Sequence, residues 1–203
     1  MNNQDLRVIK TRKNISDQLI EELKTHGFHE ISVKMLIADS QINRSTFYRN
    51  YEDKYALLDS ILQELLADFD RSLDASFVLM SYQDADAYHP KLKKMIRFFD
   101  KNREYLTVLW KAALPVNFYD VMTERVEEGL LTVLMENYEV PEKDRELLEL
   151  YACLFAAQTM ATMRWWLNSD SRMDESALLE ILTQNVEKGL FRTMKTISLY
   201  RKK

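Results

Sequence analysis

The sequence predicts an all-α protein with two helical domains, and three observations lead to this fold class. The 203 residues include only three Gly and three Pro, so turns must be few and the elements long. Leu, Glu, Lys, Met and Ala, all good helix formers, are enriched. Val and Ile do not occur in the alternating runs that a half-buried strand needs. A chain of this length buries roughly 70% of its unfolded surface, so a substantial core is available.

Two helices are expected at the start of the chain. An apolar stripe at i, i+4 and i+8 predicts a first helix from about residue 5 to His26. Gly27 would then end this helix in the left-handed conformation that glycine tolerates. Ser32 is expected to cap a second helix of only about two turns.

A tight turn is expected between this second helix and a third. The helical pattern breaks over residues 40–43, and Asn43 is the expected cap of a short helix from Arg44 to Asn50. A longer fourth helix begins two or three residues later. Together these helices predict a compact N-terminal domain, residues 1–66.

The remaining residues, 67–203, predict a second helical domain. The pattern lapses over residues 81–90, where Pro90 marks either a loop or the first turn of the next helix. Pro141 and the acidic residues that follow it favour a helix start. The helical stretches expected here are residues 92–99, 118–133, 141–167 and 175–196.

Composition argues against several classes of function. No Gly-rich phosphate loop occurs, and three His give no metal-binding spacing, so we expect no enzyme, no metal and no cofactor. The single Cys153 lies in an apolar run, which predicts a buried thiol and a reduced, cytoplasmic setting. No secretory signal is expected, and the longest uncharged run, Leu150 to Met163, is too short for the ~20 residues that span a bilayer.

The order of the first helices is the layout of a helix-turn-helix DNA reader. Such a reader needs one helix with small polar and bidentate-capable side chains that can enter the major groove. The third helix would carry these on its outer arc, with Phe47 and Tyr51 facing the domain core. The stretch RVIKTRK, Arg7 to Lys13, adds four positive charges and no acid, which predicts a polyanion partner at this end of a chain with net charge −4.

The segment INRSTFYRNYEDKYALL resembles the recognition-helix signature of the TetR family of bacterial transcriptional regulators. The match runs position by position over Ile42, Asn43, Arg44, Ser45, Thr46, Phe47, Tyr48, Arg49, Tyr51 and Lys54, and the resemblance covers about residues 8–66. The sequence departs from the family at Ile37, where Ala is usual, at Gln41, where Gly is usual, and at Asn50, where His is frequent.

This resemblance implies the residues that contact DNA. Arginine suits guanine O6 and N7, the Tyr48 hydroxyl and the Lys54 ammonium would reach phosphates, and Lys34 would add a contact that positions without specifying sequence. The predicted DNA-binding residues are Lys34, Arg44, Ser45, Thr46, Tyr48, Arg49 and Lys54.

The resemblance also implies a C-terminal domain that forms a homodimer through its last two long helices and so reads a palindromic operator. The predicted interface residues are Ala152, Phe155, Ala156, Trp166, Leu182, Val186 and Leu190. Packing of both helices within one subunit is the alternative.

Members of the family often bind a small molecule among the middle helices. The candidate walls of such a site are Phe99, Tyr105, Trp110, Phe118, Met122, Met160 and Met163. The same spacing is more often that of core residues. The modest size of this domain is also similar to a Gram-positive subgroup in which a small inducer need not be present.

The sequence therefore predicts a homodimeric, DNA-binding transcriptional repressor, relieved by an apolar or aromatic ligand and not associated with a membrane. The alternative is a TetR-fold protein-interaction module or coactivator, in which the departures at Ile37 and Gln41 weaken DNA binding.

Overall fold

The computed structural model describes residues 3–39, 42–79, 85–169, 173–191 and 200–201, and most of them are helical, which confirms the all-α fold class. Turns and loops join the helices, and the strands among the described residues form one ladder of two residues on each side, in which β1 (Tyr138–Glu139) pairs antiparallel with β2 (Tyr200–Arg201). The sequence pattern did not predict this pairing.

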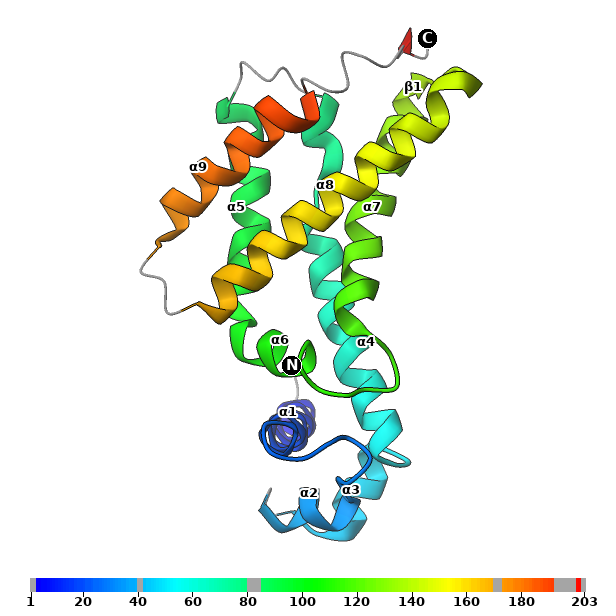
Figure 1. The fold of residues 1–203 in the computed structure, drawn as a ribbon. Helices are drawn as coiled ribbons and strands as arrows, with labels where there is room; N and C mark the ends of the chain where they lie inside the picture. Colours follow the sequence, from blue (N-terminus) through cyan, green and yellow to red (C-terminus); the bar gives the residue numbers. More distant parts are fainter. Residues whose placement is uncertain (1–2, 40–41, 80–84, 170–172, 192–199, 202–203) are drawn as a thin grey trace. The chain divides into compact units, whose positions relative to one another are not determined.

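The helices follow one another along the chain, and Figure 1 labels the α-helices among them. They are α1 (Asn3–Leu23), α2 (Val33–Asp39), α3 (Arg44–Asn50), α4 (Lys54–Ser72), the 3₁₀ helix η1 (Ala75–Leu79), α5 (Ala85–Lys101), α6 (Arg103–Leu109), α7 (Phe118–Asn137), α8 (Glu142–Asn168), α9 (Glu175–Asn185) and the π-helical turn η2 (Val186–Phe191).

The chain divides into two compact units, which we describe separately. The first unit comprises residues 1–67 together with the segment 104–118, and the second comprises residues 68–103 and 119–203. The first boundary lies one residue beyond the predicted limit of the N-terminal domain. The segment 104–118 also belongs to the first unit, although it comes from the middle of the chain. A single boundary between two continuous domains cannot describe such a unit.

In the first unit, α2 packs against both α1 and α3. Each helix contributes a fully buried apolar side chain to the shared core: Leu19, Leu36, Phe47 and Leu57 are all 0% exposed. Short helices are marginal in isolation, so α2 and α3 depend on this packing for their stability.

The end of α1 differs from the expectation at Gly27. The helix ends at Leu23, because the next N–H groups turn back to carbonyls only three residues earlier, as from Lys24 to Glu21 at 3.1 Å. Gly27 is not in the left-handed region. It lies instead in a tight turn, where its N–H donates to the Glu30 carboxylate at 2.8 Å and a Cβ would come within 2.9 Å of the His29 ring.

Two polar contacts tie the segment 104–118 into the first unit. The Tyr105 hydroxyl donates to Asp17 Oδ1 on α1 at 2.7 Å, and burial together with this hydrogen bond raises the pKa of Tyr105. The Glu104 carboxylate accepts from Lys24 Nζ at 2.6 Å. Hydrogen bonding across this exposed pair raises the pKa of Lys24 and lowers that of Glu104. Partners about 80 residues apart explain why this segment belongs with the N-terminal helices.

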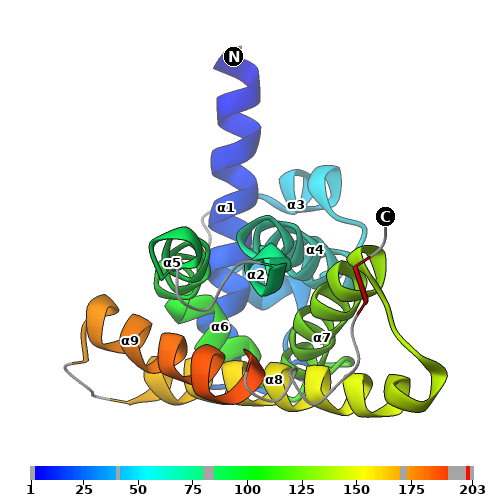
Figure 2. The same cartoon turned by 90° about the horizontal axis from the view of Figure 1, so that it is seen from above.

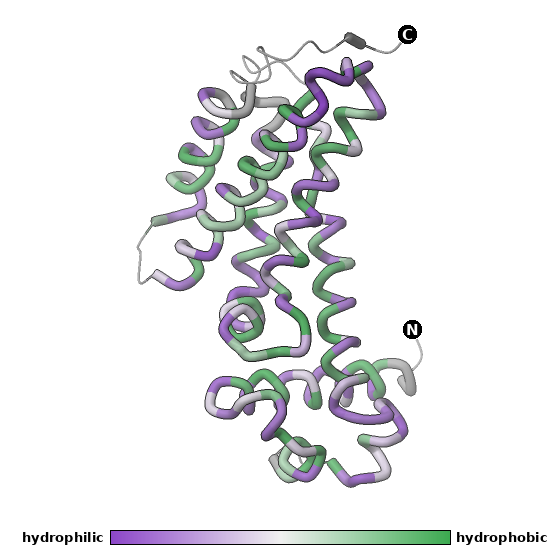
Figure 3. Tube along the Cα trace, turned by 45° about the vertical axis from the view of Figure 1, so that its right-hand side comes forward, coloured by the Kyte–Doolittle hydropathy of each residue, from purple (hydrophilic) through white to green (hydrophobic). Residues whose placement is uncertain are grey.

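The second unit is layered. Its α8 and α9 form a layer across one side of α5 and α7, as the two views in Figures 1 and 2 both show. The side chains between the layers make an apolar core that includes Phe99, Leu130, Met160 and Leu178, none more than 1% exposed. Hydrophobic and hydrophilic residues alternate around these helices in Figure 3, as amphipathic packing requires.

Two helix limits in this unit differ from the expected ones. Pro90 lies inside α5, which begins five residues earlier, rather than in a loop or a first turn. Pro90 is the sixth residue of α5, beyond the first turn in which proline is tolerated, so its ring removes one backbone hydrogen bond of this helix. The last helix ends at Asn185 and continues as the π-helical turn to Phe191, and its predicted continuation to residue 196 lies outside the described residues.

Candidate functional site

The start of α3 is fixed by Asn43. The Asn43 amide oxygen accepts from the Thr46 backbone N–H at 2.8 Å, from Thr46 Oγ1 at 2.8 Å and from Ser45 Oγ at 2.7 Å. This is the N-cap that the sequence predicted, extended to two side chains of the first turn. The orientation of Ser45 and Thr46 is therefore set before any partner arrives.

The two faces of α3 divide as the sequence predicted. Phe47 is fully buried and Tyr51 is 7% exposed, which confirms the inward face. Arg44, Ser45 and Arg49 are exposed, and Thr46 is half-buried. Tyr48 is 46% exposed, and the Arg44 guanidinium lies 5.5 Å from the centroid of its ring. Stacking of this kind restrains a long side chain that would otherwise be mobile.

Basic side chains extend this surface beyond α3. Lys34 is exposed on α2. An open groove runs along the first half of α1 and reaches the residue before the Asn43 cap. Its lining residues are Leu6, Arg7, Lys10, Thr11, Asn14 and Ile42. The groove thus places two cations of the predicted basic stretch beside the entry to α3.

Lys54 has a different environment from the other predicted DNA contacts. Its side chain is half-buried, and Nζ donates to the backbone carbonyls of Phe28 at 2.8 Å, His29 at 3.0 Å and Ile31 at 2.7 Å. These carbonyls belong to the loop between α1 and α2. No pattern within the recognition segment indicates such partners, which lie 23 to 26 residues away.

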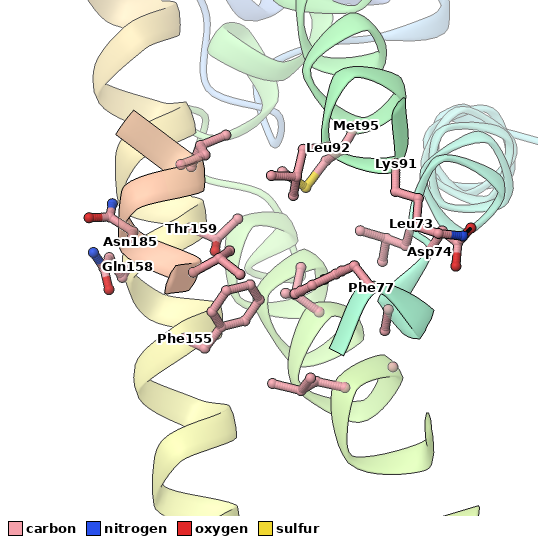
Figure 4. Close-up of a pocket in the computed structure, with 16 residues that line it drawn as sticks. Leu73, Asp74, Phe77, Lys91, Leu92, Met95, Phe155, Gln158, Thr159 and Asn185 are labelled. Atoms are coloured by element: carbon pink, nitrogen blue, oxygen red, sulfur yellow. Dashed lines mark hydrogen bonds and ion pairs between the residues drawn. The ribbon is translucent and has the colours of Figure 1, made fainter. Parts of the chain in front are cut away.

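A pocket of about 660 Å³, counting the open space at its mouth, lies inside the second unit, and about 40 Å³ of it can be reached by the centre of a water molecule. Phe77, Leu92, Met95 and Phe155 surround the space in Figure 4. Its complete lining is Leu73, Asp74, Ala75, Phe77, Lys91, Leu92, Met95, Val126, Gly129, Leu130, Phe155, Gln158, Thr159, Leu182, Asn185 and Val186. The wall is mostly apolar, as the walls of ligand pockets generally are.

The charges at the edge of this pocket neutralise each other. Asp74 and Lys91 form an ion pair, and Figure 4 shows them together at one side of the cavity. Burial alone would raise the pKa of the Asp74 carboxyl, but hydrogen bonds from Lys91 and Ser76 outweigh it and hold that pKa below its usual range. The rim therefore offers a closed ion pair and no uncompensated charge.

The seven residues predicted as ligand walls lie elsewhere, and none lines this pocket. Phe99, Phe118, Met122, Met160 and Met163 are 2% exposed or less and fill core positions. Tyr105 and Trp110 are half-buried in the first unit. One signal for the pocket was present in the sequence: Gly129 interrupts a helix, where glycine is usually costly without a packing reason.

The outer face of α8 is apolar as well. Leu150, Leu154 and Trp165 are 51%, 54% and 55% exposed, and the exposed Ala157 and Ala161 lie between them on the same stripe. On α9, Ile181 is 40% exposed. Cys153 is exposed on α8, so the expectation of a buried thiol was wrong.

Most of the residues predicted for a subunit interface face the interior of the second unit instead. Ala152, Ala156, Trp166, Leu182 and Val186 are 6% exposed or less within the single chain, so their side chains are not on a surface that a second copy could touch. Phe155 is half-buried and lines the pocket. The side chain of Leu190 lies outside the described residues.

Metal-binding clusters and membrane-spanning helices are absent from the residues that the structure describes. These residues contain no cluster of three or more His, Cys, Asp or Glu that could hold a metal ion. In the same part of the chain, no helix combines the length and apolar character needed to cross a membrane.

The chain is similar to known transcriptional regulators. Residues 86–188 match a TetR family described as the transcriptional regulator C-terminal region. The chain is 21% identical over 178 residues to the uncharacterized HTH-type transcriptional regulator YxbF of Bacillus subtilis, a match that covers 87% of this chain but 45% of that protein. The chain thus spans less than half the length of this relative.

Two solved structures share the fold. One is a TetR transcriptional regulator from Streptococcus agalactiae, with a TM-score of 0.57, 22% identity, and coverage of 91% of this chain and 97% of that one. The other is the dihydroxyacetone kinase operon activator DhaS, with a TM-score of 0.57, 18% identity, and coverage of 94% and 99%. With the family match over half of its length, the chain belongs to the TetR family of transcriptional regulators.

Proposed function

We propose that this regulator is a homodimer that binds a palindromic DNA operator, represses transcription from it, and is released by a small, largely apolar ligand. The observation that carries the proposal is α3. Its inner face is locked into the first unit by Phe47, its start is locked by Asn43, and its outer face presents Arg44, Tyr48 and Arg49. A helix held rigidly with such side chains outward is the requirement for major-groove reading.

The exposed residues of this surface divide by chemistry. Arg44 and Arg49 have the planar fork that pairs with guanine O6 and N7, and each good bidentate pair contributes about 1–3 kcal/mol of discrimination. Ser45 and Thr46 would meet base edges, and Tyr48 a phosphate. Lys34 would add a phosphate contact that positions the domain, and Arg7 and Lys10 extend the same positive surface.

Homodimerisation is supported by the outer stripe of α8, which includes Leu154 and Trp165. Large apolar side chains on one helix face favour an interface. A second copy is the occupant we propose, because two-fold symmetry lets two α3 helices read the halves of a palindrome. The interface we propose is centred on Leu150, Leu154, Trp165 and Ile181, on the side of α8 and α9 opposite to the one predicted from sequence.

Relief by a ligand is supported by the pocket in the second unit. Since Asp74 and Lys91 already neutralise each other, an uncharged ligand can enter without breaking an ion pair. We therefore propose a neutral, mainly apolar molecule that fills the space beside Gly129 and makes a hydrogen bond to Thr159.

Repression needs only occupancy of DNA that overlaps a promoter, which is why we propose this direction. The description of DhaS as an operon activator belongs to that protein, and the opposite direction is a defined outcome of the experiment below. The rival function, a protein-interaction module or coactivator, rests on Ile37, which is half-buried in α2, and on Gln41, which lies outside the described residues.

Selection of bound fragments from the source genome, followed by footprinting and a promoter-reporter assay, tests the proposal. We expect a protected palindrome, lower reporter output, and an affinity that falls with salt at about −0.9 in log K per log salt for each neutralised phosphate. Reporter output that rises would make the protein an activator. A folded protein that protects no fragment at low salt would support the interaction module instead.

A further inference from the structure

We propose that Lys54 is a positioning residue that clasps the two ends of the helix-turn-helix together, and that its ammonium does not bind a DNA phosphate. This inference rests on the proposed DNA-binding function. It assigns Lys54 a role that differs from the phosphate contact implied by the recognition-helix resemblance.

All three N–H groups of the ammonium already have acceptors. A lysine ammonium carries three donors and no acceptor. Lys54 Nζ lies 2.8 Å from Phe28 O, 3.0 Å from His29 O and 2.7 Å from Ile31 O. Two rings flank the same charge, with the centroid of Phe28 at 4.9 Å and that of Tyr55 at 5.6 Å. Oxygen dipoles and aromatic faces therefore enclose the cation.

The position of this contact in the chain lets it fix how α2 and α3 are held. Ile31 directly precedes Ser32, whose Oγ accepts from the Met35 N–H at 3.3 Å at the start of α2. Lys54 is the first residue of α4, four residues after α3 ends. The bond from Lys54 to Ile31 thus joins the two ends of the stretch 32–53, which contains α2, the turn and α3.

The loop between α1 and α2 directs three of its carbonyl oxygens at the Lys54 ammonium. Three carbonyls within four residues, from Phe28 to Ile31, converge on one point, and the bonds to Phe28 and Ile31 are partly buried. Oxygens held in this way would lose their partner without gaining full hydration if the ammonium were removed. The loop would have to turn them toward water, and the start of α2 would move with Ile31.

A phosphate contact would require the ammonium to abandon at least one of these carbonyls. Lys34 provides a direct contrast, because it is exposed on α2 of the same unit. The two lysines therefore form a matched pair. Lys34 is expected to contact DNA, and Lys54 is expected to fix the positions of α2 and α3.

Substitution of each lysine separates the roles. We expect Lys54→Met to lower operator affinity about tenfold or more, to lower non-specific affinity little, and to leave the salt slope unchanged. Lys34→Met should weaken both kinds of binding together and reduce the slope by about 0.9, the value for one phosphate. Affinities are compared at temperatures where circular dichroism shows each variant fully folded.

Lys54→Arg provides the sharpest comparison. A guanidinium binds phosphate at least as well as an ammonium, so a phosphate contact would be restored by arginine. A planar fork does not match three carbonyls around one point, so a clasp would not be restored. Full recovery of operator affinity by Lys54→Arg, or a slope reduced by one phosphate in Lys54→Met, would overturn the proposal. So would an unchanged ratio of specific to non-specific affinity in Lys54→Met.

Acetylation of the wild-type protein tests the same claim without any variant. Mass spectrometry after limited acetic anhydride treatment should show Lys54 reacting much more slowly than Lys34 in the free protein, and operator should protect Lys34 alone. A Lys54 that is reactive when free and protected on DNA contradicts the clasp. If the wild-type protein binds no DNA, the proposed function fails, whereas slow acetylation of free Lys54 would still support the clasp contact itself.

Discussion

At the scale of single residues, local chemistry was readable from the sequence and distant partners were not. Asn43 could be predicted as the cap of α3 because its bonds reach only two and three residues ahead. Phe47 and Tyr51 could be placed inward from helical spacing alone. The environment of Lys54 could not be predicted, because its three acceptors become neighbours only after the first unit has folded.

Two substitutions on the outer face of α3 test the reading surface. We expect Arg49→Ala to weaken operator binding by about 1–3 kcal/mol, the contribution of a bidentate base contact. Tyr48→Phe, which removes only a hydroxyl, should weaken binding by about 1.5–3 kcal/mol if that group meets a phosphate, because the acceptor is charged. A gel-shift titration against the selected operator measures both.

Tyr55→Phe is the matched control for Tyr48→Phe. Tyr55 is also an exposed tyrosine of the first unit, but it lies on α4 with its ring edge-on to Phe28. Its hydroxyl should be dispensable for binding. Equal effects at the two positions would exclude a specific role for the Tyr48 hydroxyl.

At the scale of elements, α8 shows where helical periodicity loses its power. The helix is apolar on the side that faces α5 and α7 and again along Leu150, Leu154 and Trp165. A pattern with two apolar faces cannot say which one is internal, and the small residues Ala152 and Ala156 pack inside. In the same way, helical spacing cannot separate buried core residues such as Met160 from the walls of a pocket, and the observed pocket lies between η1, α5, α7, α8 and α9.

A substitution on α7 tests this pocket. A Cβ built on Gly129 meets nothing within 4 Å, so Gly129→Leu should place its side chain in open space and fill the cavity. Fluorescence titration with the neutral apolar probe N-phenyl-1-naphthylamine should show saturable 1:1 binding to the wild type. We expect at least tenfold weaker binding to the leucine variant.

Gly129→Ala separates filling from helix propensity. Alanine should stabilise α7 by up to about 1 kcal/mol relative to glycine while leaving most of the cavity open. The midpoint temperature of thermal unfolding should therefore rise in both variants. The affinity for the probe should fall only in Gly129→Leu. Undiminished binding to Gly129→Leu would mean that the probe binds elsewhere.

The ion pair between Asp74 and Lys91 links the start of η1 to α5 and carries a pH dependence. The pKa of Asp74 is lowered in the folded protein, so the pair stabilises the fold above the unfolded pKa of about 3.9 and loses this effect as pH falls through the folded value. Because the Asp74 side chain is 38% exposed, we expect only about 0.5–1 kcal/mol.

Thermal unfolding from pH 7 to pH 3 tests this expectation with Asp74→Asn. The variant should be less stable than the wild type at pH 7, and the difference should shrink as pH falls below the unfolded pKa of about 3.9. Asp59→Asn, at an exposed position of α4, should show a smaller difference. A constant gap between wild type and Asp74→Asn at every pH would rule out ionisation of Asp74 as the cause.

At the scale of the whole molecule, the order of helices and the family could be predicted, but the composition of the units could not. Helix starts at Arg44 and Glu175 follow side-chain caps from Asn43 and Asp174, and the start at Glu142 follows Pro141. The segment 104–118 joins the first unit through Asp17 and Lys24, partners that no local pattern identifies. The two-residue ladder of β1 and β2 is too short to leave a sequence signal.

The oligomeric state tests the outer stripe of α8. We expect Leu154→Glu to yield monomers in sedimentation or light scattering at concentrations where the wild type is a dimer, because it places a charge among apolar side chains that a partner would bury. Helix content should be unchanged, since Leu154 is exposed in the single chain. Operator affinity should fall steeply while each half-site is still recognised weakly.

Gln63→Glu is the control, because it adds the same charge at an exposed position of α4 in the first unit, away from the stripe. A wild-type protein that is monomeric at all concentrations would contradict the dimer. Monomers from Gln63→Glu but not from Leu154→Glu would move the interface away from the stripe.

The cap of α3 has a consequence for the operator itself. Ser45 and Thr46 each have one hydroxyl proton, and both donate it to the Asn43 amide oxygen. With their protons used in this way, Ser45 and Thr46 can present only the lone pairs of their hydroxyl oxygens to a base in the major groove. Adenine N6 and cytosine N4 offer protons there, whereas thymine O4 and guanine O6 do not. We therefore expect the bases opposite these two hydroxyls to be adenine or cytosine.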